Sequence, residues 1–268
     1  MSATTSVRHA ARSPQMKGLA RLGLAARATI YLLIGWLALM LATGKRHGET
    51  DQRGALNEVA RHTGGEILLW VITAGLAAYA LWRLSEAAFG AVGEGNKKGP
   101  RIQSLVRGLI YASFAVSAFN LVTHARQQSQ VHQQQTWTAK VMSHTGGRWA
   151  IGIIGVIVIV VGLMLVVEGL THKFEKHLDL NRMSPSTRRV VRLLGTVGTA
   201  ARGVVFMVAG FFVVRAAYDF DPNKARGLDG ALRSLADNSA GPWLLGAAAL
   251  GLIAFGVYGY AEAVWRRT

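Results

Sequence analysis

The chain repeats one spacing three times: an Arg opens an apolar run, and a Glu closes the next apolar run. The separations are 59, 61 and 60 residues, for the pairs Arg27 and Glu86, Arg107 and Glu168, and Arg202 and Glu262. In each copy a Gly stands 21 residues before the Glu, at Gly65, Gly147 and Gly241. A fixed internal period indicates a repeat architecture, so we expect three tandem helical hairpins.

Charged residues are nearly absent from six apolar segments, which are approximately 28–43, 67–82, 108–123, 149–167, 203–214 and 242–261. A bilayer core of about 30 Å requires about 20 apolar residues in a helix. Each segment approaches that length when its flanking residues are included. The sequence therefore predicts an all-α polytopic membrane protein, with six transmembrane helices in three tandem hairpins and pseudo-threefold symmetry along the membrane normal.

The segment 151–167 is dense in β-branched residues, which in water would favour a buried strand. Its counterparts in the other repeats are rich in Ala, Leu and Gly, and a helix satisfies its own backbone hydrogen bonds in lipid. We therefore predict a helix here as well.

Lys and Arg are distributed unequally between the two sides of the predicted membrane. The N-terminal tail, the loops between hairpins and the C-terminus hold 19 of the 30 basic residues. The positive-inside rule then places both termini and the loops between hairpins in the cytoplasm. We read the first apolar run as a retained span, not a signal peptide. The predicted divisions are a basic cytoplasmic tail at 1–18 and hairpin repeats at 19–92, 93–175 and 176–268.

The formal net charge of +16 admits two classes of partner, nucleic acid or membrane lipid. The basic cluster of Arg182, Arg188, Arg189 and Arg192 lies beside a predicted span. Such clusters are the expected topological signal, so the predicted partners are the lipid bilayer and anionic headgroups on its cytoplasmic side. We expect no nucleic acid, and the sequence identifies no protein partner.

The hairpin topology brings the six repeated charges to one depth, near the cytoplasmic interface. An Arg offers a planar, bidentate partner to an acid that would be unfavourable alone in the membrane. We predict a ring of three Arg–Glu bridges, with Arg27 and Glu86 taken as the first pair to test. The main interpretation is a structural link between hairpins, and a gate or a proton-handling role stays open.

Aromatic residues follow the same helix faces as these charges, at spacings of three or four residues. The predicted aromatic face consists of Tyr31, Tyr79, Trp82, Tyr111, Phe206, Phe255 and Tyr258. The second helix of the middle repeat lacks aromatics on this face and carries Ile157, Val161 and Met164 instead. This departure argues against a symmetric ligand pocket.

Each connection within a hairpin carries a short amphipathic pattern that ends at Gly. This pattern predicts a short helix that lies flat in the outer interface and caps the hairpin. His62 and His144 occupy the same repeat position in two of these connections. We expect them to cap the short helices, and the alternative is a paired metal site.

Motifs for phosphate loops, zinc hydrolases, nucleophilic serine hydrolases and dinucleotide binding are absent from the sequence. The chain has no Cys, which excludes disulfides and thiolate metal sites. We therefore predict no catalytic residues, no bound cofactor and no metal.

Two openings of the repeat, Ala26-Arg27-Ala28 with Tyr31 and Ala201-Arg202-Gly203 with Phe206, carry a resemblance to a known family. The connection at Gly230-Ala231-Leu232 fits the same pattern. The chain from about residue 18 onward resembles the bacterial membrane proteins classified as domain of unknown function 1206. This resemblance implies tandem copies of a two-helix unit in a bacterial plasma (inner) membrane, and it implies no activity or substrate.

The sequence favours a non-catalytic integral membrane protein that acts as a scaffold or binds a partner or lipid. The alternative is a transporter or channel for a small solute or ion along the pseudo-threefold axis. An enzyme is the third class. A continuous polar cavity on the axis would favour transport, whereas packed side chains there would favour a scaffold or lipid-binding protein.

Overall fold

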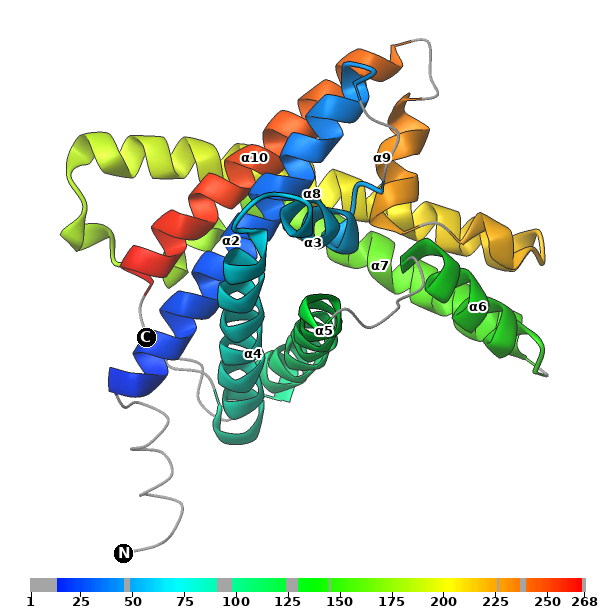
Figure 1. The fold of residues 1–268 in the computed structure, drawn as a ribbon, viewed down its shortest axis with the longest axis horizontal. Coiled ribbons are helices and arrows are strands. Elements are labelled where there is room, and N and C mark those ends of the chain that lie inside the picture. Colours follow the sequence, from blue (N-terminus) through cyan, green and yellow to red (C-terminus); the bar gives the residue numbers. More distant parts are fainter. Residues whose placement is uncertain are drawn as a thin grey trace, which may run out of the picture.

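The structure, a computed structural model, describes residues 14–45, 49–90, 98–123, 130–144, 146–225, 227–236 and 240–266. Most of the predicted basic tail at 1–18 lies outside these residues. Within these described residues, six helices are long and apolar enough to cross a membrane: α2 (Pro14–Ala42), α4 (Gly65–Phe89), α5 (Lys98–Val122), α7 (Gly147–Leu170), α8 (Pro185–Tyr218) and α10 (Gly241–Trp265). The chain is thus an all-α, six-span membrane protein (Figure 1).

Shorter elements connect the spans. Three short α-helices, α3 (Gln52–Ala60), α6 (Gln130–Met142) and α9 (Leu228–Ala236), lie in the connections within repeats. The 3-10 helices are η1 (Lys173–His177), η2 (Leu180–Arg182) and η3 (Pro222–Lys224). The prediction of a helix for the β-branched segment is confirmed, since that segment lies within α7.

The repeated Gly-Gly pairs begin two of the spans. Gly64 and Gly146 have φ of +79° and +80°, a left-handed conformation that favours Gly. The following Gly65 and Gly147 approach the preceding short helix so closely that an added Cβ would lie 1.7 and 1.8 Å from a carbonyl oxygen. Each pair therefore ends the short helix and starts the span in one sharp turn.

The most extensive packing joins one repeat to the next. Helix α4 packs along α5, α7 along α8, and α10 along α2, so the last span meets the first. Figure 1 shows α2 and α10 side by side over much of their length. Spans of the same repeat contact less in the pairs α2 with α4 and α8 with α10. In the described chain, α5 and α7 make no comparable contact. The two spans of a repeat are thus adjacent in the sequence, but each packs most extensively on a span of another repeat.

Glycines explain the close packing of α7 on α8. Gly155, Gly162 and Gly169 recur every seven residues on α7, and the neighbours that an added Cβ would meet at all three belong to α8. A Cβ added to Gly203 of α8 would lie 2.6 Å from the carbonyl oxygen of Gly162. In lipid, small residues let helix backbones approach, and the packing contacts then hold the pair together. The other faces of α7 lie on the protein surface, where a bilayer would cover them. Of the residues in its apolar stretch, 17% are buried in the protein.

The short helices cover the ends of the spans with their apolar faces. Helix α3 packs on α2, α4 and α5, and α9 packs on α8 and α10. Leu56 of α3 and Leu232 of α9 are fully or almost fully buried. Helices α3 and α9 therefore cap the spans, as the amphipathic pattern predicts. Their apolar residues are buried against the protein because the span ends offer them an apolar surface.

Asp51 begins α3 and is 2% exposed. Its Oδ1 accepts a hydrogen bond from the backbone N–H of Gly54 at 2.9 Å. The neighbouring backbone N–H of Thr50 donates to Oδ1 of Asp229 at 2.7 Å, which connects the first repeat to the third. Burial raises the pKa of Asp51 from 3.8 to about 6.

This raised pKa predicts a pH dependence that Asp51→Asn removes. The folded protein binds the proton more tightly than the unfolded chain, so the contribution of Asp51 to stability falls as pH rises from about 4 to about 6. Asn caps a helix as well as Asp does. Between about pH 4 and about pH 7, the free energy of unfolding of Asp51→Asn should rise by on the order of 1–3 kcal/mol relative to that of wild type. Unfolding curves of both proteins in detergent at both pH values test this. The prediction is refuted if the difference in free energy of unfolding between variant and wild type is the same at pH 4 and pH 7.

Candidate functional site: a buried cluster of arginines and aromatic rings

An ion pair between the first and third repeats lies on the side of the membrane where α2 begins and α10 ends, called here the terminal side. Nη2 of Arg27 on α2 donates to Oε2 of Glu262 on α10 at 2.6 Å. Both residues are more than nine-tenths buried. Arg266 on the following turn also pairs with Glu262. This carboxylate therefore has two guanidinium partners.

The other repeated charges do not form equivalent bridges. Glu86 pairs with Arg83 of its own helix at 2.7 Å and accepts a hydrogen bond from the Ser104 hydroxyl at 3.2 Å. Within the described ranges, Arg107, Arg202 and Glu168 form no ion pair. The prediction of three equivalent bridges is wrong for these residues, as is the pairing of Arg27 with Glu86.

Arg83 and Arg266 account for this difference, and the sequence analysis missed both. Arg83 lies three residues before Glu86, one helical turn away, and so reaches it without crossing between helices. The matching positions in the other repeats are Leu165 and Gly259. A charge inside an apolar span, present in one repeat and absent from the others, was the available signal.

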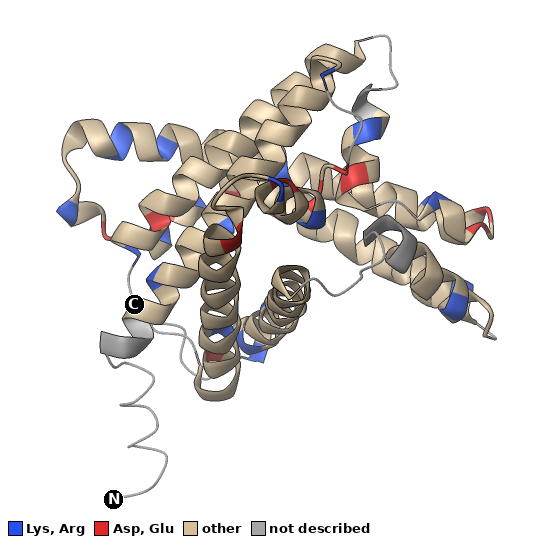
Figure 2. Cartoon of the chain, viewed as in Figure 1, with Lys and Arg blue, Asp and Glu red and all other residues tan. Residues whose placement is uncertain are grey.

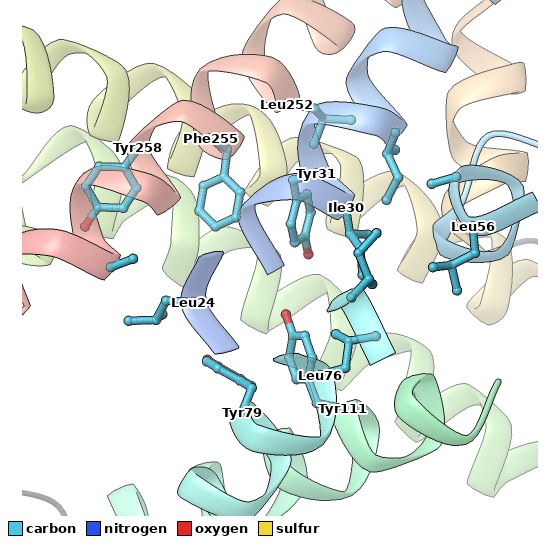
Figure 3. Packing of buried hydrophobic residues seen from close by; sticks show 14 of the residues in the cluster. Leu24, Ile30, Tyr31, Leu56, Leu76, Tyr79, Tyr111, Leu252, Phe255 and Tyr258 are labelled. Atoms are coloured by element: carbon cyan, nitrogen blue, oxygen red, sulfur yellow. The ribbon is translucent and has the colours of Figure 1, made fainter. Parts of the chain in front are cut away.

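Six of the seven aromatic residues predicted to share a face belong to one buried cluster, where they come from α2, α4, α5 and α10 (Figure 3). Phe206 on α8 lies outside that cluster. The ring centroids of Tyr31 and Phe255 are 4.8 Å apart, and those of Tyr79 and Tyr111 are 4.5 Å apart, both with edge-on geometry. Trp82 contacts Tyr79 at 5.4 Å. Packed side chains thus occupy the region where the repeats meet.

Guanidinium groups lie over these rings. Arg202 has its Cζ 5.2 Å from the ring centroid of Tyr31 and 4.9 Å from those of Phe206 and Phe255. Arg27 lies over Phe255 at 5.4 Å and over Tyr79 at 5.7 Å. Each such cation–π contact contributes roughly 0.5–2 kcal/mol, the larger values applying away from water.

We call this group of residues the arginine–aromatic centre. Its cations are Arg27, Arg83, Arg107, Arg202 and Arg266, its acids are Glu86, Glu168 and Glu262, and its rings are Tyr31, Tyr79, Trp82, Tyr111, Phe206, Phe255 and Tyr258. Guanidinium groups outnumber carboxylates in it. Figure 2 shows long uncharged stretches along the spans, with charged residues gathered toward their ends.

A second basic feature lies at the start of α8. Ser184 caps this helix, and its hydroxyl accepts a hydrogen bond from the N–H of Thr187 at 3.2 Å. Pro185, Arg188, Arg189 and Arg192 line a surface hollow of about 360 Å³.

Arg192 also binds Glu175 of η1 at 2.5 Å. The hydrogen bond from Arg192 lowers the pKa of Glu175, so this carboxylate stays ionised. Arg188 and Arg189 are both exposed on the surface beside it.

The two repeat histidines act at the ends of short helices. Nδ1 of His62 lies 2.8 Å from the carbonyl oxygen of Glu58, and Nδ1 of His144 lies 2.8 Å from that of Lys140. Each ring thus contacts a carbonyl four residues earlier, as the capping interpretation predicts. Over the described residues, no group of three or more His, Cys, Asp or Glu side chains is arranged to hold a metal ion.

Comparison with known proteins matches this repeat organisation. The profile of a family described as Domain of Unknown Function (DUF1206) matches the chain three times, at residues 22–90, 102–172 and 197–266. Over 256 residues the chain is 32% identical to "Uncharacterized protein YxxB" of Bacillus subtilis (strain 168), which covers 94% of this chain and 92% of that protein. No solved structure gives a significant match. The chain therefore belongs to the DUF1206 family and carries three copies of its domain.

Proposed function

We propose that the protein is a non-catalytic component of the plasma membrane, with its terminal side in the cytoplasm, and that this side binds anionic lipid headgroups. The observation that carries the proposal is the basic hollow at the start of α8, lined by Arg188, Arg189 and Arg192. A surface rich in Arg next to a span is suited to phosphate groups of lipid, which Arg binds in a bidentate geometry.

The charge distribution supports the same surface. The terminal side of the chain has a net charge of +13 and the opposite side +3, counted over the whole sequence. Helix α8 has 34 residues and is about 51 Å long at 1.5 Å per residue, which exceeds the bilayer core. Its first turns therefore extend to headgroup depth. The exposed Val190 and Leu193 each lie next to an arginine there, as in helices that bind membrane surfaces.

Packing where the repeats meet supports a binding protein over a channel. Leu24, Leu76 and Tyr79 are fully buried in the core cluster, and Tyr31 and Tyr111 are nearly so. These side chains fill the region that a conducting path along the pseudo-threefold axis would need. The proposal therefore takes lipid binding as the function and leaves transport as the alternative that a flux assay would reveal.

Removing Arg188 and Arg189 together tests lipid binding. Each basic residue near an anionic membrane surface contributes about 1 kcal/mol, so the double Gln variant should bind phosphatidylglycerol roughly 30-fold more weakly. Native mass spectrometry of the protein titrated with phosphatidylglycerol and phosphatidylcholine measures the difference. The matched control replaces Arg215 and Arg233 with Gln, two cations that pair with Asp219 and Asp229. Equal loss in both double variants, or loss in neither, would reject the proposal.

A further inference from the structure

We infer that Glu175 is a built-in competitor of the lipid phosphate, whose carboxylate occupies Arg192 of the basic hollow until a headgroup displaces it. This inference rests on the lipid-binding function proposed above and concerns the regulation of the same site. Nε of Arg192 donates to Oε1 of Glu175 at 2.5 Å, and Nη2 of Arg192 donates to Oε2 at 3.1 Å. One guanidinium group thus binds both carboxylate oxygens, which is the bidentate geometry that Arg also uses for phosphate.

Buried residues on either side of Glu175 hold it beside the hollow. Phe174 is buried, and an added Cβ at Gly195 of α8 would lie 2.4 Å from its ring. The centroid of the same ring lies 5.2 Å from that of Tyr258 on α10. Leu178, at the other end of η1, is fully buried. A carboxylate tethered in this way has a high effective concentration at the guanidinium group, so a headgroup must compete with it.

The ion pair itself is open to such an exchange. The Arg192 side chain is 46% exposed, and it lines the hollow together with Arg188 and Arg189. Arg188 and Arg192 lie four residues apart on α8, so their side chains project from one face of the helix. Ion pairs at an exposed surface are weak, because water and salt screen them. A phosphate in the hollow can therefore replace the carboxylate when the Glu175 side chain rotates away, while the backbone of η1 stays in place.

The charge of Glu175 also reduces the attraction of the hollow for anions. The hydrogen bond from Arg192, together with the positive charges of Arg192 and Arg188, lowers the pKa of this carboxylate, so it competes in its ionised form. Arg188 and Arg189 form no ion pair in the part of the chain that the structure describes. With Glu175 in place the hollow thus offers two uncommitted guanidinium groups, and displacement of the carboxylate adds a third.

Glu175→Gln should bind phosphatidylglycerol roughly fivefold more tightly than wild type, because it frees one more basic residue for the headgroup. Native mass spectrometry with phosphatidylglycerol, and with phosphatidylcholine as the lipid of no net charge, measures this gain. Glu175→Ala also lacks the carboxylate and should give the same gain. Adding Arg192→Gln to Glu175→Gln should return the affinity to within about twofold of wild type. Asp179→Asn is the matched control, because it removes the same charge from a carboxylate that forms no ion pair in the described chain, and it should leave the affinity unchanged.

Three results would overturn the competition: equal affinity of wild type and Glu175→Gln for phosphatidylglycerol, an equal gain in Asp179→Asn, or a gain that persists without Arg192. In each of these cases lipid binding itself stands as long as the Arg188 and Arg189 double variant binds phosphatidylglycerol more weakly than wild type. Failure of the lipid-binding proposal gives a different pattern. Wild type and Glu175→Gln would then both bind phosphatidylglycerol no better than phosphatidylcholine, and the inference about Glu175 would be rejected with it.

Discussion

Glu262→Gln is expected to lower the free energy of unfolding by about 3–5 kcal/mol, the usual cost of removing one partner from a buried ion pair. The loss is large because Glu262 is the carboxylate partner of both Arg27 and Arg266. Without it, two guanidinium groups remain in a site that already holds more cations than acids. The link between α2 and α10 across the first and third repeats also weakens.

Equilibrium unfolding in mixed detergent micelles measures this loss. A double-mutant cycle with Arg27→Gln should give a coupling energy of more than about 1 kcal/mol. Glu175→Gln provides the control, because Glu175 pairs with the exposed Arg192 and such pairs contribute about 0–1 kcal/mol. Equal effects of the two Glu→Gln substitutions, or zero coupling with Arg27, would contradict a structural role for the buried pair.

Gly198→Ala is expected to destabilise the protein by about 1–3 kcal/mol or more, through overpacking between α8 and α10. An added Cβ would lie 2.4 Å from the backbone nitrogen of Phe255 and 2.5 Å from its Cα. Because these are backbone atoms, the two helices must separate. The ring of Phe255 contacts Tyr31 and both Arg27 and Arg202, so this separation also disturbs the arginine–aromatic centre.

Gly246→Ala in α10 is the matched control. An added Cβ there meets nothing within 4 Å, and Ala has the higher helix propensity in a helix interior. This substitution should leave the free energy of unfolding unchanged or raise it by up to about 1 kcal/mol. The close-packing account of α8 and α10 would be wrong if Gly198→Ala proved as well tolerated as Gly246→Ala.

The order and type of the six spans and the three short α-helices followed from the sequence, because length and hydropathy govern which segments can cross a bilayer. The internal repeat strengthened each assignment. It allowed the β-branched stretch of α7 to be assigned as a helix from its counterparts, and it located the Gly-Gly pairs that begin α4 and α7.

The repeat did not reveal which charged residues pair or which spans pack together, because these contacts depend on residues that differ between copies. Arg83 exists in one repeat and binds Glu86 within its own helix. The pairing of spans across repeats depends on which glycines face which neighbour, and Gly162 with Gly203 shows this for α7 and α8. Six of the seven predicted aromatic residues do lie in one core cluster, because a spacing of three and four residues determines which helix face they share.

Cysteine accessibility tests most directly the central claim that the basic terminal side faces the cytoplasm. The chain has no Cys of its own, so single substitutions need no background removal. Ser186→Cys lies at the exposed start of α8, and Ser143→Cys lies on the exposed opposite side after α6. In intact cells, a membrane-impermeant maleimide should label Ser143→Cys, and it should label Ser186→Cys only after permeabilisation. Labelling of Ser186→Cys in intact cells, with Ser143→Cys protected, would contradict the account.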